Sequence, residues 1–467
     1  MSSLKRRYAP WVDALRSSDT AKAAGLAGAM IANNILALGS TVLFARLLDD
    51  YGALAALVSY LLILTVAGQA MQVATAREGV LGNLGVGEGL IATLKQWTTA
   101  LLLLSAVLTV ISIALQDPIA AAVGVKKYSW AAAVGLPAGC LYLEVSLLRG
   151  ALQGLGDYKS VGISLIGEQA TRLVTGAVLA ATWLGVTGAY LGSLLSYMAM
   201  SLYCWMQIRR HIPRARTRTK VSVAVDLWTH VKGAWAPIAG LSVIAVLQNI
   251  DLIAAKHRFA GVKDLANSYA ATAVAAKVLV WVAIGASFYL VPEVSRRRSA
   301  GEDTRPVLAK ALAIILVCAV PVLLIFAFGS HQLLSAVFKP NQQKATNALL
   351  VLGIAFTVLA ATYLAIQYML ALKRTWFLVV IGAVAVLEPV LLLNASRNPR
   401  SFAAVVLAVQ VVGAVLVFGM ALRRERVPPA SSAPPTGDGQ PGVGLTGATN
   451  GSAPSREVLS DALGRGA

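Results

Sequence analysis

The chain has 467 residues, of which 57% are hydrophobic and 13% are charged, and its mean hydropathy is +0.70. A typical soluble domain carries about 25% charged residues. This composition therefore excludes a disordered chain, a nucleic-acid-binding domain and a conventional soluble enzyme. The formal net charge of +19 then matters for the side of a bilayer on which the basic residues lie.

Twelve apolar runs are long enough to cross the hydrocarbon core of a bilayer as helices, which takes about 20 residues each. They are expected near residues 23–46, 52–74, 97–115, 128–150, 160–183, 185–206, 233–255, 268–291, 307–329, 345–371, 375–394 and 401–422. The runs are continuously apolar rather than alternating, which indicates helices. We predict an all-α integral membrane protein with twelve transmembrane helices.

Basic residues alternate strongly between the two sides of these runs. Of the 40 Lys and Arg residues, 28 lie on the side of the N-terminus, counting those at the ends of runs, and ten lie on the opposite side. Cytoplasmic loops carry such an excess of Lys and Arg. We therefore expect a multi-pass protein of the cytoplasmic membrane with both termini in the cytoplasm.

The chain divides into two sets of six runs with three polar segments around them. A cytoplasmic N-terminal segment (1–22) precedes the first six runs (23–206), a basic cytoplasmic linker (207–232) precedes the second six (233–426), and a tail rich in Pro, Gly, Ser and Thr (427–467) is expected to be disordered. The two sets share a weak pattern, because Arg46 and Arg258 end a run and Tyr51 and Tyr269 begin the next.

Ionisable residues inside an apolar run are costly, by about 2.5–3.5 kcal/mol each, and therefore mark candidate sites. Lys277 lies near the middle of the eighth run, with no acid three or four residues away. We expect it to face a cavity, the alternative being an ion pair with another helix. Asp251 in the seventh run can either neutralise Lys277 or titrate during ion coupling, and the sequence leaves both open.

Some of the other ionisable residues in the runs have a possible ion-pair partner on the same helix, and some do not. Glu168 and Arg172 are spaced i, i+4 on the fifth run, so that they can pair directly. Glu144 and Glu388 have no local partner, and Glu388 precedes Pro389, which frees a backbone carbonyl in mid-helix.

Side-chain amides gather in the first two runs. Asn33 and Asn34 are adjacent in the first run, and Gln69 and Gln72 lie three apart in the second. Such amides either hydrogen-bond between helices or line a path for a hydroxyl-rich cargo.

No catalytic, metal or cofactor motif is expected. The sequence has no P-loop, no nucleophile elbow and no HExxH motif, and its four histidines lack metal-ligand spacing. Enzymatic chemistry and a nucleotide-driven reaction are therefore not expected of this chain.

Four groups of residues share a pattern with a known family. They are Phe44–Leu48 with Tyr51-Gly52, Leu148–Gly156, Leu247–Asp251 with Tyr269–Ala271 and Lys277, and Val291–Ser295. These segments resemble the polysaccharide flippases, a branch of the multidrug/oligosaccharidyl-lipid/polysaccharide (MOP) exporter superfamily. The resemblance spans residues 21–424.

This resemblance implies two six-helix lobes around a central cavity. It also implies that the protein moves polyprenyl-pyrophosphate-linked oligosaccharides to the outer leaflet by alternating access. The expected partners are this substrate, membrane lipids, and a polysaccharide polymerase or glycosyltransferases, with no nucleic acid. Lipid II flippases of the same superfamily often carry two further helices, which this chain lacks.

The resemblance and the polar residues together define the candidate site. The resemblance implies, by position, that Arg46, Lys277 and Asp251 line the cavity. The other cavity candidates are Asn33, Asn34, Gln248, Asn249 and Arg172, and the coupling candidates are Asp251, Glu168 and Glu388.

Two other functions compete with the flippase. A cation-coupled multidrug exporter of the MATE type would need an acid-lined cavity, whereas Arg46, Arg172 and Lys277 contribute positive charge. A membrane-embedded glycosyltransferase or ligase would need catalytic loops on the outer face, and the loops expected there are short.

Overall fold

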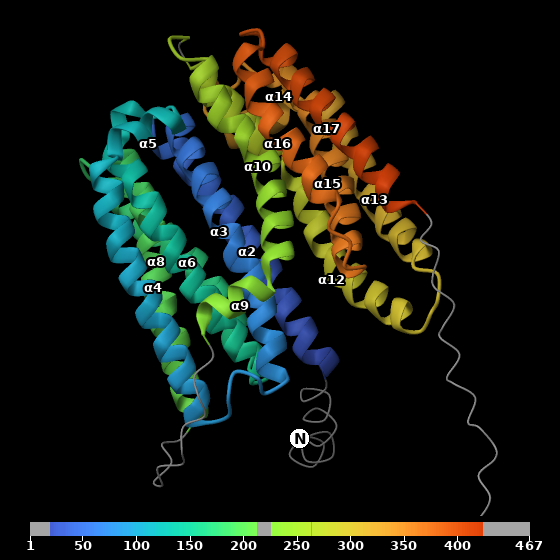
Figure 1. Ribbon diagram of the computed structural model, residues 1–467. Coiled ribbons are helices and arrows are strands. Elements are labelled where there is room, and N and C mark those ends of the chain that lie inside the picture. Colours follow the sequence, from blue (N-terminus) through green and yellow to red (C-terminus); the bar gives the residue numbers. More distant parts are fainter. Residues whose placement is uncertain (1–18, 213–225, 263, 424–467) are drawn as a thin grey trace, which may run out of the picture. The chain divides into compact units, whose positions relative to one another are not determined.

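The computed structural model of the chain describes residues 19–212, 226–262 and 264–423 (Figure 1). Most of the predicted N-terminal segment (1–22), much of the predicted linker (207–232) and the whole predicted tail (427–467) lie outside these residues. All regular structure in the described ranges is helical. A helix satisfies its own backbone hydrogen bonds, which is what an apolar segment requires in a bilayer.

The first part of the chain, here called the N-half, comprises residues 19–211. Its α-helices are α2 (Asp19–Leu47), α3 (Tyr51–Val80), α4 (Glu88–Ala114), α5 (Gln116–Val123), α6 (Ser129–Gly154), α7 (Tyr158–Ala180) and α8 (Gly185–His211).

The second part, here called the C-half, comprises residues 235–421 and follows the short α9 (Leu227–Gly233). Its α-helices are α10 (Trp235–Arg258), α11 (Leu265–Ala276), α12 (Val278–Ser299), α13 (Arg305–Phe328), α14 (Ser330–Val337), α15 (Leu349–Ala371), α16 (Phe377–Asn394) and α17 (Pro399–Ala421).

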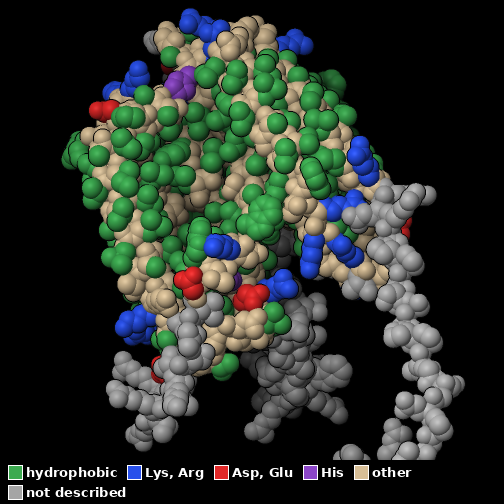
Figure 2. All heavy atoms as spheres, in the orientation of Figure 1, with side chains coloured by type: hydrophobic (Ala, Val, Ile, Leu, Met, Phe, Trp, Pro, Cys, Tyr) green, Lys and Arg blue, Asp and Glu red, His purple; other side chains and the backbone are tan. Residues whose placement is uncertain are grey.

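Ten helical segments in the described residues are long and apolar enough to cross a membrane. They do not include α7 and α8, which occupy the fifth and sixth predicted runs and are 23 and 27 residues long. In Figure 2, hydrophobic side chains cover the visible flank, and charged side chains gather toward the ends of the helices. The predicted all-α membrane fold is confirmed, and the count of twelve spans stays a prediction.

The helix connections gather at two ends. At one end, here called the Asp49 end, Lys256 at the end of α10 contacts Asp50 before α3, and Arg258 donates to the Ala395 carbonyl after α16. At the opposite end, here called the basic end, Arg298 of α12 donates to the Leu372 carbonyl after α15. Successive long helices therefore run between these two ends.

Glycines allow α3 and α6 to pack closely. A Cβ atom on Gly150 of α6 would lie 2.5 Å from the Gln72 carbonyl oxygen of α3, and one on Gly79 would lie 3.1 Å from the Cα of Gly154. Small residues let membrane helices approach in this way, because dispersion contacts and not hydrophobicity drive their association. This packing places Arg149, the neighbour of Gly150, deep among the helices of the N-half.

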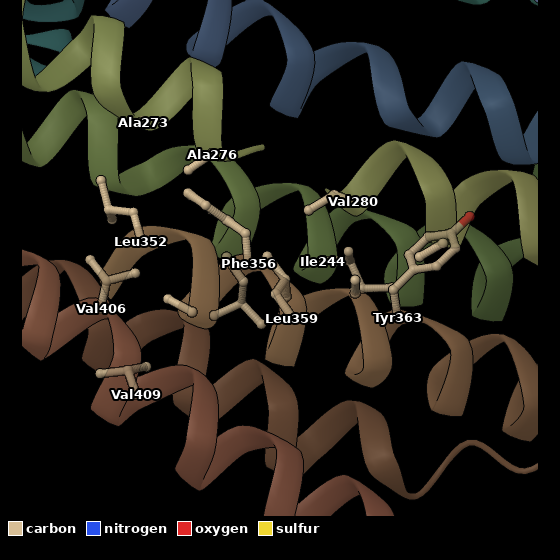
Figure 3. Close-up of a cluster of buried hydrophobic side chains, with 14 of the residues drawn as sticks. Ile244, Ala273, Ala276, Val280, Leu352, Phe356, Leu359, Tyr363, Val406 and Val409 are labelled. Atoms are coloured by element: carbon tan, nitrogen blue, oxygen red, sulfur yellow. The ribbon is translucent and has the colours of Figure 1, made fainter. Parts of the chain in front are cut away.

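The core of the C-half is built around α15. The side chains of Leu352, Phe356 and Leu359 are fully buried there, together with Ile244 of α10 and Val280 of α12 (Figure 3). The same core extends to the N-half, since it also contains residues of α2 and α3, namely Ala45, Tyr51 and Ala55.

The short helix α9 packs on the N-half through His230. The imidazole stacks on Trp97 of α4, with ring centroids 4.9 Å apart and an interplanar angle of 19°. Its Nε2 atom lies 3.1 Å from the Thr75 hydroxyl of α3. Burial lowers the pKa of His230 below its ordinary value of 6.5, and the nearby Glu78 offsets part of this effect. Docking therefore favours the neutral imidazole.

Docking of α9 is expected to weaken in acid. The undocked His230 takes up a proton at its ordinary pKa and the docked one resists it, so docking is fully stable above about pH 6.5 and weakens below it. Each unit of lowered pKa corresponds to about 1.4 kcal/mol. Hydrogen exchange of α9, corrected for the intrinsic rate, should accelerate as the pH falls below about 6.5.

The control for this prediction is His230→Gln, which removes the titrating group. Exchange in α9 of this variant should show no such acceleration in acid. The same acceleration in both proteins would contradict a role for His230 protonation.

Candidate functional site

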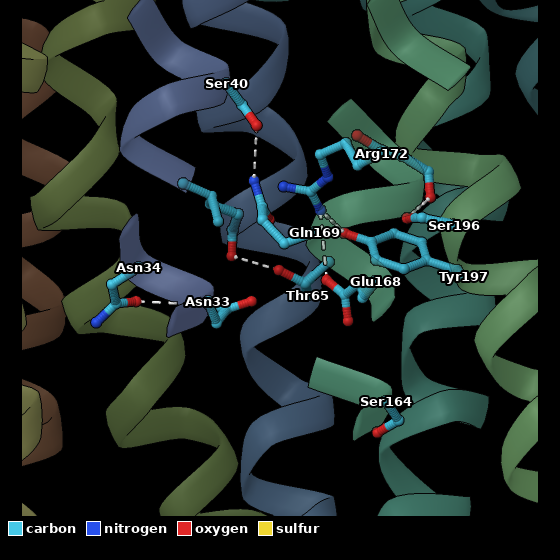
Figure 4. A network of polar contacts seen from close by, with 12 residues as sticks. Asn33, Asn34, Ser40, Thr65, Ser164, Glu168, Gln169, Arg172, Ser196 and Tyr197 are labelled. Atoms are coloured by element: carbon cyan, nitrogen blue, oxygen red, sulfur yellow. Dashed lines mark hydrogen bonds and ion pairs between the residues drawn. The ribbon is translucent and has the colours of Figure 1, made fainter. Parts of the chain in front are cut away.

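Buried charges of the N-half meet between α6, α7 and α8 in a group here called the arginine cluster: Arg149, Glu168, Arg172 and Tyr197. The Glu168 carboxylate lies 2.9 Å from the Arg149 guanidinium and 3.5 Å from that of Arg172. Arg172 also donates to the Tyr197 hydroxyl at 2.8 Å, as Figure 4 shows. The predicted Glu168–Arg172 pair is confirmed, but Arg149 makes the shorter contact.

Sequence reasoning missed Arg149, because it lies at the end of an apolar run and was counted with the cytoplasmic basic residues. In the structure its exposed fraction is 0%. Its Nε atom donates to the Ser164 hydroxyl at 2.8 Å, and a terminal nitrogen donates to the Ser164 carbonyl at 2.9 Å. The fifth run does contain a sign of this contact. Ser164 and Glu168 are spaced i, i+4, so they lie on one face of the helix. Two polar side chains on one face of an apolar helix indicate a polar partner on a neighbouring helix.

The arginine cluster carries more positive than negative charge. Two guanidinium groups share the single Glu168 carboxylate, and arginine stays protonated in proteins. One terminal nitrogen of Arg149 and the Nε atom of Arg172 are buried without a hydrogen-bond partner among the described residues. Coulomb interactions are strong in a low-dielectric interior, so this group favours an anion nearby.

The amides of α2 lie in the same polar region (Figure 4). Asn33 and Asn34 are half-buried, and the Asn33 amide donates to Asn34 at 3.5 Å. Further along α2, Ser40 accepts a hydrogen bond from Gln169 of α7 at 3.4 Å. On α2, Ser40 therefore accepts a hydrogen bond from a neighbouring helix. Asn33 and Asn34 stay candidates for lining a polar path.

Buried charges of the C-half form a second group, here called the lysine cluster: Asp251, Tyr269, Lys277, Glu388 and Gln410. The Lys277 ammonium lies 3.1 Å from the Asp251 carboxylate and 5.3 Å from the centre of the Phe356 ring. The Tyr269 hydroxyl donates to the other Asp251 oxygen at 3.4 Å. Asp251 is 0% and Lys277 is 6% exposed.

In this structure Lys277 forms the ion pair that the sequence left as the alternative. The pair joins α10 to the α11–α12 junction, and the cavity position of Lys277 stays a prediction. Asp251 is correspondingly the partner of Lys277 in this conformation. Its second expected role, titration during ion coupling, stays a prediction.

Lys277 also stands where the predicted eighth helix is interrupted. It lies between α11 and α12, with φ −68° and ψ −9°. The Lys277 amide still donates to Ala273, four residues back, but the Val280 amide donates to the Lys277 carbonyl, only three residues back. A 3₁₀ turn inside a long helix often marks a hinge. Transporters place such interruptions beside charged sites.

Glu388 of α16 is the second acid of the lysine cluster. Its exposed fraction is 0%, and its side chain accepts a hydrogen bond from Gln410 of α17 at 3.2 Å. It lies close enough to interact electrostatically with both Asp251 and Lys277. Its second oxygen has no partner among the described residues. Glu388 therefore stays a coupling candidate.

Two of the remaining predicted residues, Asn249 and Arg46, make hydrogen bonds to groups outside both clusters. The Asn249 amide donates to Ala245 of its own helix at 2.9 Å, and Gln248 is half-buried on α10. Arg46 is exposed and donates to the Ala336 and Val337 carbonyls at the end of α14, at 2.6 and 3.1 Å. In this structure Arg46 therefore holds the end of α14, and the cavity position implied by the resemblance stays a prediction.

A groove of about 470 Å³ lies on the flank of α4 and is lined by residues such as Lys95, Thr99 and Leu103. None of its lining residues belongs to the predicted site. The central cavity implied by the resemblance stays a prediction.

Removing Lys277 is expected to destabilise the protein by leaving Asp251 buried without its ion-pair partner. Breaking a buried pair in this way costs about 3–5 kcal/mol. Lys277→Ala should therefore lower the Tm in detergent, and the Lys277→Ala/Asp251→Asn double variant should recover part of the loss. Lys310→Ala, at an exposed position of α13, should leave the Tm unchanged. Equal Tm values for the first two variants would contradict the pair's contribution.

The fold is similar to that of solved transporters. A multidrug resistance transporter of the MATE family and MOP superfamily, in an inward-facing conformation, matches with a TM-score of 0.63 and 12% identity over 83% of this chain and 93% of the other. The lipid II flippase MurJ, in an inward closed conformation, matches with a TM-score of 0.65 and 15% identity over 85% and 87%.

A third solved structure is a MOP superfamily transporter from Pyrococcus furiosus, described as having a binding pocket of reverse polarity that suggests a different function. It matches with a TM-score of 0.53 and 14% identity over 85% of this chain and 93% of the other. No protein-family model matches the sequence, and no curated protein does. The chain is therefore a multi-pass membrane protein with the fold of the MOP superfamily transporters, as its sequence resemblance predicted.

Proposed function

We propose that the protein flips a polyprenyl-pyrophosphate-linked oligosaccharide from the inner to the outer leaflet of the cytoplasmic membrane by alternating access, during cell-surface polysaccharide synthesis. The observation that supports this proposal best is the excess positive charge of the arginine cluster. A pyrophosphate is a multiply charged anion, and guanidinium groups bind phosphate oxygens with a matching fork of donors.

The burial of these arginines strengthens their attraction for an anion. A guanidinium in contact with water interacts weakly with a distant anion, whereas one in a low-dielectric interior interacts strongly. Arg149 is held by Ser164 and Glu168, so its direction is fixed before an anion approaches. A preorganised donor of this kind saves the cost of ordering a flexible side chain during binding.

The charge pattern of the ends supports the direction of transport. The basic end of the C-half carries Arg296, Arg297 and Arg298 at the end of α12 and Arg305 at the start of α13. Under the proposal this end lies in the cytoplasm, as the positive-inside rule favours. The Asp49 end then faces outward, and the headgroup enters from the basic end.

A cation-coupled multidrug exporter is the second candidate, and the lysine cluster favours it. Two carboxylates, those of Asp251 and Glu388, lie near the single ammonium of Lys277. An acidic group of this kind suits a cationic cargo or a coupling cation. In the flippase, the same group serves the coupling, and Glu168 is a further coupling candidate.

Neutralising the arginine cluster is expected to slow transport of the anionic lipid. A hydrogen bond to a charged group is worth about 1.5–3 kcal/mol, which corresponds to a loss of about tenfold or more. Arg149→Gln and Arg172→Gln should each reduce the flipping rate of a fluorescent polyprenyl-pyrophosphate-linked disaccharide in proteoliposomes by this factor. Arg149→Lys keeps the charge without the fork and should lose less.

The matched control is Lys95→Gln, which removes an exposed positive charge from α4 of the same half. It should flip the lipid at the parent rate, and size-exclusion chromatography identifies any variant that fails to fold. Ethidium transport in the same vesicles tests the exporter. Ethidium transport without lipid flipping by the parent protein would reject the flippase in favour of the exporter.

A further inference from the structure

A side chain of the C-half caps the first turn of a helix in the N-half. Asn267 of α11 accepts a hydrogen bond from the Gly52 amide of α3 at 2.8 Å, and its own amide donates to the Asp49 carbonyl at 2.8 Å. The first amides of a helix lack partners within the helix. Asn267 thus satisfies one of these amides across the junction of the two halves.

Gly52 is the residue that this contact requires. A Cβ atom at position 52 would lie 2.7 Å from the Asn267 side-chain oxygen and 3.2 Å from the backbone nitrogen of Asn267. A larger residue at position 52 would displace the Asn267 side chain from the Gly52 amide. The Tyr51-Gly52 pair, noted in the sequence as part of a resemblance, thereby acquires a physical role.

Other contacts join the halves at the same end, among them the following three. The Lys256 ammonium lies 2.5 Å from the Asp50 carboxylate, and Gln342, which is 0% exposed, donates to the Ala45 carbonyl at 2.9 Å. Arg46 holds the end of α14, as described above. Together with the Asn267–Gly52 contact, these interactions are here called the latch.

The same helix that carries the latch residue reaches the lysine cluster. Tyr269, two residues after Asn267, donates to Asp251. At the other end of the 12-residue α11, Lys277 forms both the 3₁₀ turn and the ion pair with Asp251. At 1.5 Å per residue, about 15 Å separates the latch residue from this turn. A change in the Asp251–Lys277 ion pair therefore acts at one end of α11, and Asn267 lies near the other end.

We propose that α11 is a hinged arm that closes the Asp49 end through Asn267 and opens it when the Asp251–Lys277 pair separates. The ion pair holds the arm against α10, and in that position Asn267 reaches Gly52. Separation of the pair frees the 3₁₀ turn at Lys277 and withdraws Asn267 from α3. This inference rests on the proposed transport function for its purpose, but its test needs no transported substrate.

The test measures access to Ala55, which is 5% exposed and packed in the core shared by the two halves. Ala55→Cys is introduced after Cys140, Cys204 and Cys318 are replaced by serine. The rate at which a membrane-impermeant maleimide labels this cysteine in vesicles reports opening of the Asp49 end. We expect Asn267→Ala to raise the labelling rate about tenfold, the effect of losing roughly 1.4 kcal/mol from the closed state.

The matched control is Asn398→Ala. Asn398 lies at the same end and accepts a hydrogen bond from the Arg400 amide at 3.0 Å, but it caps α17 within the C-half alone. This variant should label at the parent rate. Equal labelling of the Asn267→Ala and Asn398→Ala proteins would overturn the latch.

The second arm of the experiment tests the link to the ion pair. Asp251→Asn keeps the shape of the side chain and removes the charge that holds Lys277, so it should also raise labelling of the Ala55→Cys protein. Parent-rate labelling in Asp251→Asn, together with fast labelling in Asn267→Ala, would overturn the hinged arm. Asn267→Asp, which keeps the acceptor for the Gly52 amide, should label at an intermediate rate and guards against a folding defect.

A disulfide supplies an independent measurement. The Gly52→Cys/Asn267→Cys pair, in the cysteine-replaced background, should form a cross-link upon oxidation that stops lipid flipping, and reduction should restore it. Unchanged flipping by the fully cross-linked protein would overturn the latch. If the reduced protein flips no lipid, the proposed function fails, while the labelling rates still decide the inference about α11.

Discussion

The need to pair charge inside an apolar body governs this structure. Asp251 is fully buried and Lys277 nearly so, and neither could stay there alone without a large desolvation cost. Their 3.1 Å contact cancels most of the charge, and the Tyr269 hydroxyl meets the remaining Asp251 oxygen. The pair therefore fixes where α10 stands against α11 and α12. Through α11 it also fixes the contact between the two halves.

Neither half balances its buried charged groups fully, and the group that is left over, here called the remainder, differs between the halves. In the N-half, two arginines share one acid, and the remainder is positive. In the C-half, Glu388 adds a second carboxyl group to an ion pair that is already neutral, and this carboxyl group is the remainder. Under the proposed function, this difference separates two tasks. The positive remainder suits the anionic headgroup, and the acidic remainder suits the coupling cation.

The sequence predicted the helices well, because a run of apolar residues in a bilayer has few alternatives to a helix. It also predicted the Glu168–Arg172 pair, because an i, i+4 spacing is local. Arg149 could not be placed in this way, because Ser164 and Glu168 hold it from the next helix. Hydropathy alone treats an arginine at the end of a run as solvated. For Lys277, the sequence named the partner but could not decide between a pair and a cavity, which depends on how α10 packs against α11.

Arg46 and Arg258 show why the internal similarity of the halves misleads about function. Both arginines end a helix at the Asp49 end, and both donate to carbonyls at the end of another helix. Arg258 meets Ala395 within its own half, whereas Arg46 meets Ala336 in the other half. The same local motif thus stabilises one half in one case and joins the two halves in the other. Under the proposed alternating access, only contacts of the second kind break when the halves separate, so the moving parts lie where the two halves differ.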